Sequence, residues 1–350
     1  MKSRLSSRVN LTLVLWPIVL LGLLYLNIIK TNSDACAHTA AQITTIRSDD
    51  FNTCALDPVW DFVNPLGDAT YQMTNTFTED ALLLVSVPAG TKHSISDSNT
   101  NAPRIMQPAP DADFQVEVKF ESLLSEQYQV DGVLVKGAGL DEFLRFDFFS
   151  QVVSDSTEIR IYAASLVSAT LTPYNDAIIT SPAAGEALFM RVERVGDEWT
   201  QSYSYYADGP WTDTVTFAHT MTVGAVGVYA GSTSGEGPPE TTPAHTGLVD
   251  YFFNTDSPIT SEDGERNELM VRAVGNGDVD WHPRKPSYSC SEAVTLTATA
   301  DPGWSFAIWS GGLISRNNPE TISMTGSRVI MAVFTQDAYQ IFLPIIARSH

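Results

Sequence analysis

Basic residues and cysteines are scarce in this chain of 350 residues. Its 20 lysines and arginines face 41 aspartates and glutamates, which gives a formal net charge of −21. A surface this acidic repels phosphates, so the composition argues against nucleic acid as a partner. The sequence has three cysteines and no CxxC pair, Cys/His cluster or HExxH motif, which argues against a zinc site. With 43% hydrophobic residues the chain is not expected to be disordered, and its length fits about two domains.

One long apolar run is present, at residues 11–29, behind Lys2, Arg4 and Arg8. Small residues follow it at 35–37, in the A-x-A spacing that signal peptidase accepts. We therefore expect residues 1–37 to be a signal peptide or, because the run is just long enough to span a bilayer, an N-terminal membrane anchor helix. Both alternatives place the rest of the chain outside the cell or at its surface, with no other membrane contact.

The cysteines allow two interpretations. If Cys36 is removed with the signal, Cys54 and Cys290 remain. In an oxidising compartment such a pair can form one bridge between two domains. Because distance along the chain does not show that two Cα atoms come close, we expect two unpaired thiols, with the bridge as the alternative.

The region 48–257 has the pattern of β-strands throughout. Segments such as 114–123, 143–150 and 188–196 alternate polar with apolar residues, are rich in Val, Ile, Phe and Tyr, and are separated by Gly, Asp, Ser or Pro. No convincing amphipathic helix interrupts them. Many short antiparallel strands without crossover helices predict an all-β fold, a two-sheet sandwich or jelly roll.

Several pieces of this region, the most specific being the block W-x-x-S-Y-S followed by D-G-x-W at 199–211, resemble a known family. The chain is similar there to bacterial concanavalin A-like domains of the DUF1349 and β-xylosidase C-terminal type. One departure is that Tyr206 and Ala207 lengthen the turn, which predicts a bulge or a longer hairpin between Tyr205 and Asp208. The resemblance implies a jelly roll that accompanies glycosidases or surface proteins and binds a polysaccharide or a cell-surface glycan.

A second unit is predicted at residues 269–336. Its V-T-L-T-A, D-P-G-W-x-F-x-x-W-S-G and A-V-F-T signatures resemble the small all-β repeat of bacterial surface proteins, of the InlB B-repeat type. Trp304, Phe306 and Trp309 are expected to form its core rather than a sugar platform, because a domain this small needs its aromatic residues to fold. The polar stretch 258–268 is expected to be a linker.

The apolar tail 337–350 is too short to span a membrane. It resembles an L-P-[LIV]-[LIV]-x-R ending of exported bacterial proteins, which implies a surface-retention or export tag. The alternative is a final strand that docks on the repeat.

No catalytic residues are predicted. Jelly-roll glucanases carry E-x-D-x-x-E on one strand, so that two carboxylates bracket a glycosidic bond, and this motif is missing. Glu142 and Asp147 are an odd number of residues apart, which places them on opposite faces of a regular strand. The histidines at 93, 219, 245 and 282 show no fixed spacing to Ser or Asp and are expected at the surface or in loops.

Two pairs of charged residues share a strand face, Arg145 with Asp147 and Arg191 with Glu193. They are expected to be neutralised charge on a solvated sheet face or, alternatively, hydrogen-bonding partners of sugar hydroxyls.

The densest aromatic cluster is Trp199, Tyr203, Tyr205 and Trp211. By parity the first three point to one face of their strand. If that face is the inner one they are core residues; if it is the outer one, Tyr203 and Tyr205 are a stacking platform for a sugar ring.

One structural calcium ion is considered as a cofactor. The stretch DSNTNA at 97–102 is no EF-hand, because Ala102 stands where the turn glycine belongs. The resemblance to jelly-roll domains implies a calcium site formed by the two ends of the domain, where Asp49, Asp50 and Asp250 are the candidate ligands.

These observations favour a non-catalytic exported protein that binds carbohydrate through its jelly roll. A glycoside hydrolase or lyase whose carboxylates come from separate strands is the alternative, and a purely structural surface protein is a third.

Overall fold

The structure is a computed structural model, and it describes residues 45–78, 80–97, 99–139, 141–183 and 186–338. The predicted signal or anchor at 1–37 lies outside the described residues, and so does the tail from residue 339 on. Among the residues described, no helix has the length and apolar character needed to cross a membrane.

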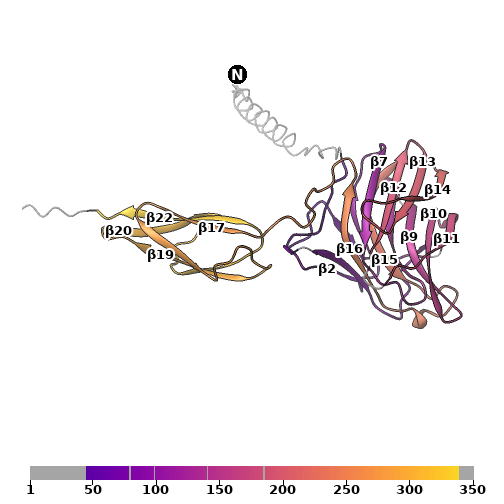
Figure 1. Cartoon of the computed structure of the whole chain (residues 1–350), viewed down its shortest axis with the longest axis horizontal. Helices are drawn as coiled ribbons and strands as arrows, with labels where there is room; N and C mark the ends of the chain where they lie inside the picture. The colour runs from indigo at the N-terminus through magenta and orange to yellow at the C-terminus, as the bar shows by residue number, and fades with distance from the viewer. Residues whose placement is uncertain (1–44, 79, 98, 140, 184–185, 339–350) are drawn as a thin grey trace, which may run out of the picture. The chain divides into compact units, whose positions relative to one another are not determined.

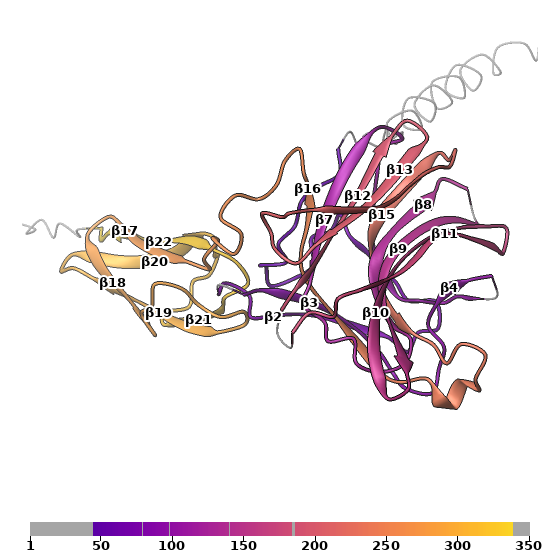
Figure 2. The same ribbon diagram turned by 45° about the vertical axis from the view of Figure 1, so that its right-hand side comes forward.

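The large domain consists of two seven-stranded antiparallel sheets packed face to face (Figure 1 and Figure 2). The prediction of an all-β sandwich is therefore confirmed. Sheet 1 has the order β14 (Thr212–Ala218), β13 (Glu198–Ser204), β12 (Leu188–Val195), β7 (Phe114–Phe120), β16 (His245–Asn254), β3 (Leu82–Val87) and β2 (Thr70–Thr74). Sheet 2 has the order β1 (Asp61–Val63), β6 (Arg104–Pro108), β15 (Val223–Ser232), β8 (Gln129–Gly137), β9 (Glu142–Val153), β10 (Ser156–Val167) and β11 (Thr170–Ile179).

The main core lies between the two sheets and follows from the alternation along each strand. On β12, Met190 and Val192 are buried, whereas Arg191 and Glu193 between and beyond them point to the other face. Trp199 of β13, Phe146 of β9 and Phe252 of β16 are fully buried in the same cluster. Each such side chain contributes about 1.5–3 kcal/mol relative to an exposed one.

Two tight turns keep β9, β10 and β11 in register. Ser154 and Asp155 connect β9 to β10 with φ of 49° and 65°, and Ser168 and Ala169 connect β10 to β11 with φ of 49° and 60°. Consecutive residues with positive φ form the primed turns whose twist suits antiparallel strands. These hairpins fix which side chains of β9 and β10 lie beside one another.

A smaller core covers the outer face of sheet 2. The short hairpin β4 (Ile95–Ser96) and β5 (Asn99–Thr100) belongs to it, since Ile95 is fully buried against side chains of β6, β8, β9, β10 and β15. Among them are Leu134, Phe143 and Tyr229. This face of the sheet is therefore partly closed to solvent.

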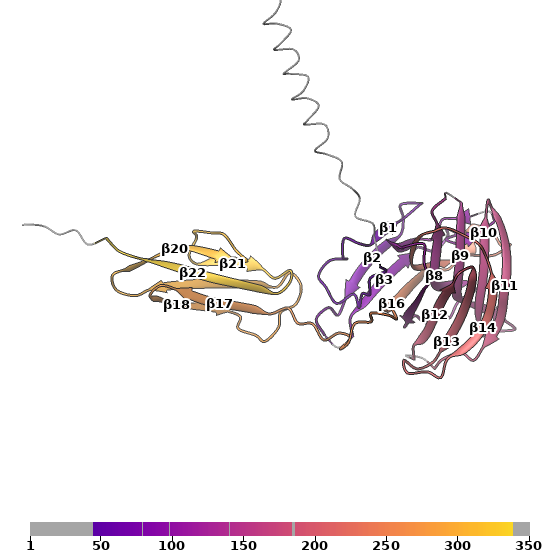
Figure 3. The same ribbon diagram turned by 90° about the horizontal axis from the view of Figure 1, so that it is seen from above.

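The small domain holds two three-stranded sheets (Figure 3). Trp309 is fully buried at the centre of its core, and Trp304 and Phe306 pack against that core from its edge, in agreement with their predicted role. One sheet has the order β17 (Leu269–Val274), β22 (Arg328–Gln336) and β20 (Trp304–Gly311); the other has β18 (Gly277–His282), β19 (Ala293–Ala300) and β21 (Glu320–Ser323).

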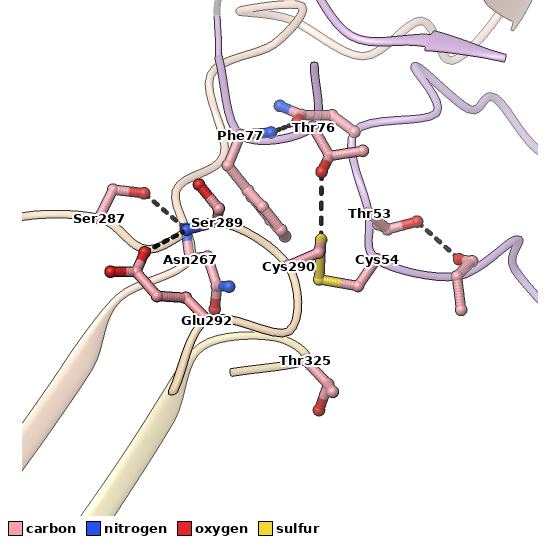
Figure 4. The surroundings of a disulfide bond; sticks show 12 residues. Thr53, Cys54, Thr76, Phe77, Asn267, Ser287, Ser289, Cys290, Glu292 and Thr325 are labelled. Atoms are coloured by element: carbon pink, nitrogen blue, oxygen red, sulfur yellow. Dashed lines mark hydrogen bonds between the residues drawn. A yellow bond between two sulfur atoms is a disulfide. The ribbon is translucent and has the colours of Figure 1, made fainter. Parts of the chain in front are cut away.

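Cys54 and Cys290 form a disulfide bond, with their Cα atoms 5.4 Å apart (Figure 4). Thr76 Oγ1 lies 3.1 Å from the sulfur of Cys290. The expectation of two unpaired thiols is thus wrong, and the alternative of one bridge between the domains is the one observed. Chain spacing could not reveal this, because 236 residues separate the two cysteines and only the folded backbone brings them together.

Candidate functional site

A groove of about 590 Å³ opens at the end of sheet 1, beside the connection between β13 and β14. Its volume falls within the usual range of small-molecule sites. The connection is long, because β13 ends at Ser204 and β14 begins at Thr212, so the predicted longer hairpin is present. The lining residues are Lys119, Glu121, Thr180, Ser181, Pro182, Glu186, Ala187, Phe189, Tyr205, Tyr206, Ala207 and Asp208.

Two tyrosines form the aromatic part of this groove. Tyr205 lines it and donates its hydroxyl hydrogen to the carbonyl oxygen of Thr180 at 2.7 Å, which fixes the orientation of its ring. Burial raises the pKa of Tyr205, and the neighbouring Tyr203 raises it further. Tyr206 is 66% exposed, a large fraction for an aromatic side chain. The groove therefore combines the ring of Tyr205, whose orientation is fixed, with the solvent-exposed ring of Tyr206.

Three of the four residues of the predicted aromatic cluster, Trp199, Tyr203 and Tyr205, belong to the main core or pack against it. Trp199 is fully buried, and Tyr203 packs against the same core, with its ring 5.6 Å from that of Tyr205 in an edge-on arrangement. Tyr205 packs against the same core, so parity places all three residues on the inner side, and of the two predicted platform residues only Tyr205 also lines the groove. Tyr206 also lines the groove but is not among the predicted site residues. The sequence feature that points to it is the lengthened turn, which Tyr206 and Ala207 form.

Polar groups surround the two rings. Lys119 bonds to Glu121 at 2.8 Å, and the Glu186 carboxylate accepts a hydrogen bond from the backbone of Ala183. A narrower hollow of about 190 Å³ adjoins the groove and shares Glu121, Ser181, Pro182 and Glu186 with it. The two together offer hydroxyls, carboxylates and one ammonium group next to aromatic surface.

Arg191 and Trp211 lie on the outer face of sheet 1, where the guanidinium carbon is 3.8 Å from the centre of the Trp211 ring. Arg191 is paired with Glu117 of β7, at 2.7 Å, and not with Glu193 as predicted. Tyr251 also donates to Glu117, at 2.6 Å, and its burial raises its pKa. Arg191 pairs with Glu117 because the strand register places the two residues directly opposite each other.

Arg145 and Asp147 do share a face, and the β4–β5 hairpin covers part of that face. Asp147 is fully buried and accepts two bonds from Arg145, at 2.7 and 2.9 Å, and one from the Tyr229 hydroxyl at 2.7 Å. Arg145 also donates to the carbonyl oxygen of Ile95 in the covering hairpin. Burial would lower the pKa of Arg145, but the adjacent Asp147 carboxylate outweighs it and raises the value. The pair holds the hairpin to the sheet, and the buried Asp147 is not on a solvated face as predicted. Arg145 also lines a hollow of about 170 Å³ with Tyr128 and Tyr162, so its predicted contact with sugar stays a prediction.

The prediction that the histidines lie at the surface or in loops holds for His93 and His219, which lie in loops between strands, and for the exposed His282. It is wrong for His245, the buried first residue of β16. His93 is fully buried and lies 3.0 Å from Asp68, and His245 is buried 2.9 Å from Asp131. His219 lies 3.1 Å from Glu142. This contact points Glu142 away from Asp147, which confirms that the two acids occupy opposite faces of β9. His282 is exposed as expected.

Acidic side chains converge at another place, where the segment after β16 returns to the large domain. We call Asp50, Asp250, Glu262 and Asp263 the acidic cluster. The Glu262 carboxyl is within bonding range of both Asp250 and Asp263, and the backbone N–H of Asp263 donates to Asp50. Burial and the neighbouring Asp250 raise the pKa of Glu262 to about 9, and burial with Asp250 and Asp50 raises that of Asp263 to about 6.

The predicted calcium ligands are only partly brought together. Asp50 and Asp250 both adjoin Asp263, but Asp49 faces elsewhere, since its carboxylate accepts bonds from the Trp60 indole and the backbone of Phe51. Asp49 is therefore removed from the ligand set. Glu262 and Asp263, which adjoin Asp250, belong to the polar stretch 258–268 that the sequence predicts to be a linker.

The acidic ligand atoms that all lie within 4.8 Å of one another are those of Asp80, Glu121 and Asp250, so of the predicted calcium ligands only Asp250 belongs to a group that could hold a metal ion in the part of the chain that the structure describes. Among the described residues, Asp250 Oδ1, Glu262 Oε1 and Asp263 Oδ1 are buried and have no hydrogen-bond partner. Carboxylate oxygens are the ligands that calcium prefers. Hydrolytic carboxylates, by contrast, stand about 5–9.5 Å apart across a cleft, whereas those of the acidic cluster are in contact and none of its four members lines the groove.

Residues 267–338 match the family model described as a divergent InlB B-repeat domain. The identification covers the small domain. No curated protein matches the chain.

Among solved structures, the chain is similar to the GH43 BlXynB protein from Bacillus licheniformis, at 14% identity and a TM-score of 0.41, over 59% of this chain and 38% of that one. It is also similar to a Bacteroides ovatus mixed linkage glucan GH16 structure, at 11% identity and a TM-score of 0.43, over 59% of this chain and 98% of that one. A third is the CBM2 module of the Lactobacillus casei BL23 phage J-1 evolved Dit, at 11% identity and a TM-score of 0.41, over 59% and 94%. This chain thus spans well under half the length of the GH43 protein.

Proposed function

We propose that this is an exported, non-catalytic surface protein whose large domain binds polysaccharide in the groove beside the β13–β14 connection. The observation that carries the proposal is the pairing of Tyr205 and Tyr206 with a rim of hydroxyls, carboxylates and the Lys119 ammonium group. A tyrosine ring offers an apolar face and a polar tip, which suits a ligand whose rings are apolar on their faces and hydroxylated at their edges.

The rest of the chain supports a location at the cell surface. The small domain matches a repeat model, and its sequence resembles a repeat of bacterial surface proteins. The apolar segment at 11–29 has the pattern of an export signal or anchor. The disulfide is in keeping with an oxidising compartment. The resemblance of the large domain to the DUF1349 type is part of the same proposal.

A glycoside hydrolase is the second candidate, and one observation favours it. Three carboxyl groups, those of Glu121, Glu186 and Asp208, line the groove and come from separate segments of the chain. A catalytic pair assembled in this way would leave no local motif in the sequence.

The experiment is binding of the full-length chain to a panel of insoluble plant and cell-wall polysaccharides, with the release of reducing sugar measured in parallel. We expect retention on at least one polysaccharide without release of sugar. Tyr206→Ala and Tyr205→Ala should lower the retained fraction at least several-fold. Tyr71→Ala is the matched control, because Tyr71 is also an exposed tyrosine of the large domain, 41% exposed, and lies outside the groove.

The outcomes separate the candidates. Release of sugar that disappears in Glu121→Gln or Glu186→Gln would establish the hydrolase instead. Retention that is the same in Tyr206→Ala, Tyr205→Ala and the control would remove the groove assignment, and retention on no polysaccharide would leave a purely structural surface protein.

A further inference from the structure

Hydrogen-bond acceptors dominate the polar rim of the groove beside the β13–β14 connection. Three carboxylates, those of Glu121, Glu186 and Asp208, line it together with the ammonium group of Lys119. An ionised carboxylate accepts hydrogen bonds and donates none. Glu186 and Asp208 are exposed, so a ligand in the groove meets their carboxylates directly.

The positive charge of Lys119 is already neutralised. Its ammonium group is bonded to Glu121 and to the buried Asp250. Burial would lower the pKa of Lys119, but these two bonds outweigh burial and raise it. Asp80 adds a third carboxylate, whose ligand atom lies with those of Glu121 and Asp250 within 4.8 Å of one another. The wall of the groove around Lys119 is therefore negative overall.

Glu186 and Asp208 come to the groove from two segments of the chain. Glu186 lies just before β12, and Asp208 lies in the β13–β14 connection, as Tyr205 and Tyr206 do. The tyrosine rings offer apolar contact to a sugar of any charge, so the carboxylates decide which substituents the sugar can carry. Screening at physiological salt limits the reach of an exposed charge to about 8 Å. These two carboxylates therefore act on a bound ligand more strongly than the rest of the acidic surface does.

We propose that the groove selects polysaccharides by charge: it takes chains that carry hydroxyl or amino groups and rejects chains that carry carboxylate, sulfate or phosphate groups, with Glu186 and Asp208 as the residues that determine this preference. The inference rests on the proposed function of the groove and adds the class of glycan. Hydroxyl and ammonium groups donate hydrogen bonds to carboxylates, and an ammonium group adds the attraction of opposite charges. An acidic group brings only acceptors and a like charge, so it loses its bonds to water without replacing them.

The test uses the full-length chain and three ethers of the polysaccharide retained in the panel above: the hydroxyethyl, carboxymethyl and aminoethyl ethers, at one degree of substitution. These substituents are similar in size and differ in charge. Binding is measured in EGTA, so that no divalent cation bridges the carboxylates of the polymer to those of the protein. At low salt we expect the carboxymethyl ether to bind about three- to tenfold more weakly than the hydroxyethyl ether, and the aminoethyl ether to bind at least as tightly as the hydroxyethyl ether. Addition of about 0.5 M NaCl should bring the three affinities closer together, since salt screens exposed charges.

The double variant Glu186→Gln/Asp208→Asn tests the two residues, and Glu236→Gln/Glu240→Gln is its matched control. Glu236 and Glu240 are exposed, lie between β15 and β16 outside the groove, and undergo the same change of charge. We expect the groove variant to bring the affinity for the carboxymethyl ether to within about twofold of that for the hydroxyethyl ether. The control should keep the wild-type ratio. A merely structural effect lowers both affinities and leaves their ratio unchanged.

Equal affinity of the wild type for all three ethers would overturn the inference and leave the proposed function intact. The inference also fails if the control changes the ratio of affinities as much as the groove variant does, since the preference then belongs to the charge of the whole protein. Retention on no polysaccharide of the panel would overturn the proposed function, and this inference with it.

Discussion

Cys54 and Cys290 are 236 residues apart in sequence and covalently joined in the fold. The bond connects the beginning of the large domain to the small domain, so the chain between them forms a closed loop. The stretch between the domains is also held to the large domain by hydrogen bonds of Asp263 with Asp50 and Ala81.

Removing this bond should destabilise the protein. The double variant Cys54→Ser/Cys290→Ser loses the restriction that the closed loop places on the unfolded chain, and we expect a loss of about 2–5 kcal/mol in the free energy of unfolding. Urea unfolding of wild type and variant, with and without reductant, measures it. Reductant should shift the wild type to the midpoint of the variant, and a wild-type midpoint indifferent to reductant would contradict the bond.

The buried pair under the β4–β5 hairpin should matter far more than an exposed pair on the same sheet. Asp147→Asn leaves Arg145 buried with its charge uncompensated, so we expect it to cost about 3–5 kcal/mol. The control is Asp176→Asn, which breaks the exposed pair of Asp176 with Arg160 and should cost about 0–1 kcal/mol. Equal midpoints for the two variants in urea unfolding would show that the Asp147 network is not a stabilising element.

Gly132 should resist substitution because two strands approach closely there. A Cβ atom at this position would lie 2.3 Å from the carbonyl oxygen of Phe146 and 2.6 Å from the Cβ of Asp147. We expect Gly132→Ala to cost about 1–3 kcal/mol, the usual cost of overpacking. Gly139→Ala is the control, since a Cβ there meets no atom within 4 Å. Thermal unfolding should separate the two variants by several degrees.

Asp111 should contribute a small, pH-dependent stabilisation. Its bond from Arg194, at 2.7 Å, is the main cause that lowers its pKa, and a bond from the backbone of Val223 acts in the same direction. A carboxyl whose folded pKa is lowered stabilises the fold above its ordinary value of 3.8, and this contribution disappears as the pH falls through the folded value. Since Asp111 is largely exposed, the effect should be at most about 1 kcal/mol.

The check on Asp111 is urea unfolding between about pH 2 and 6. The midpoint of wild type and that of Asp111→Asn should differ near pH 6 and converge in acid. A difference that grows as the pH falls would contradict this assignment.

The sequence by itself determined the layers of this protein. Alternation of period two and the turn residues between strands are local properties, and they predicted a two-sheet sandwich in the region where the structure shows β1 to β16. The same is true of the small domain, whose aromatic signature predicted a core that contains Trp309. Parity along β9 was enough to place Glu142 and Asp147 on opposite faces, because a regular strand fixes that relationship within a few residues.

Only the tertiary structure decided which faces are covered and which groups meet. Parity showed that Arg145 and Asp147 share a face, but the hairpin that buries them comes from about fifty residues earlier in the chain. Asp250 meets Lys119 of another strand and Glu262 of the stretch after β16, and the partner of Cys54 comes from the other domain. The physical reason is that burial and pairing depend on segments distant in sequence, and composition cannot distinguish a solvated acidic linker from one whose carboxylates return to the fold.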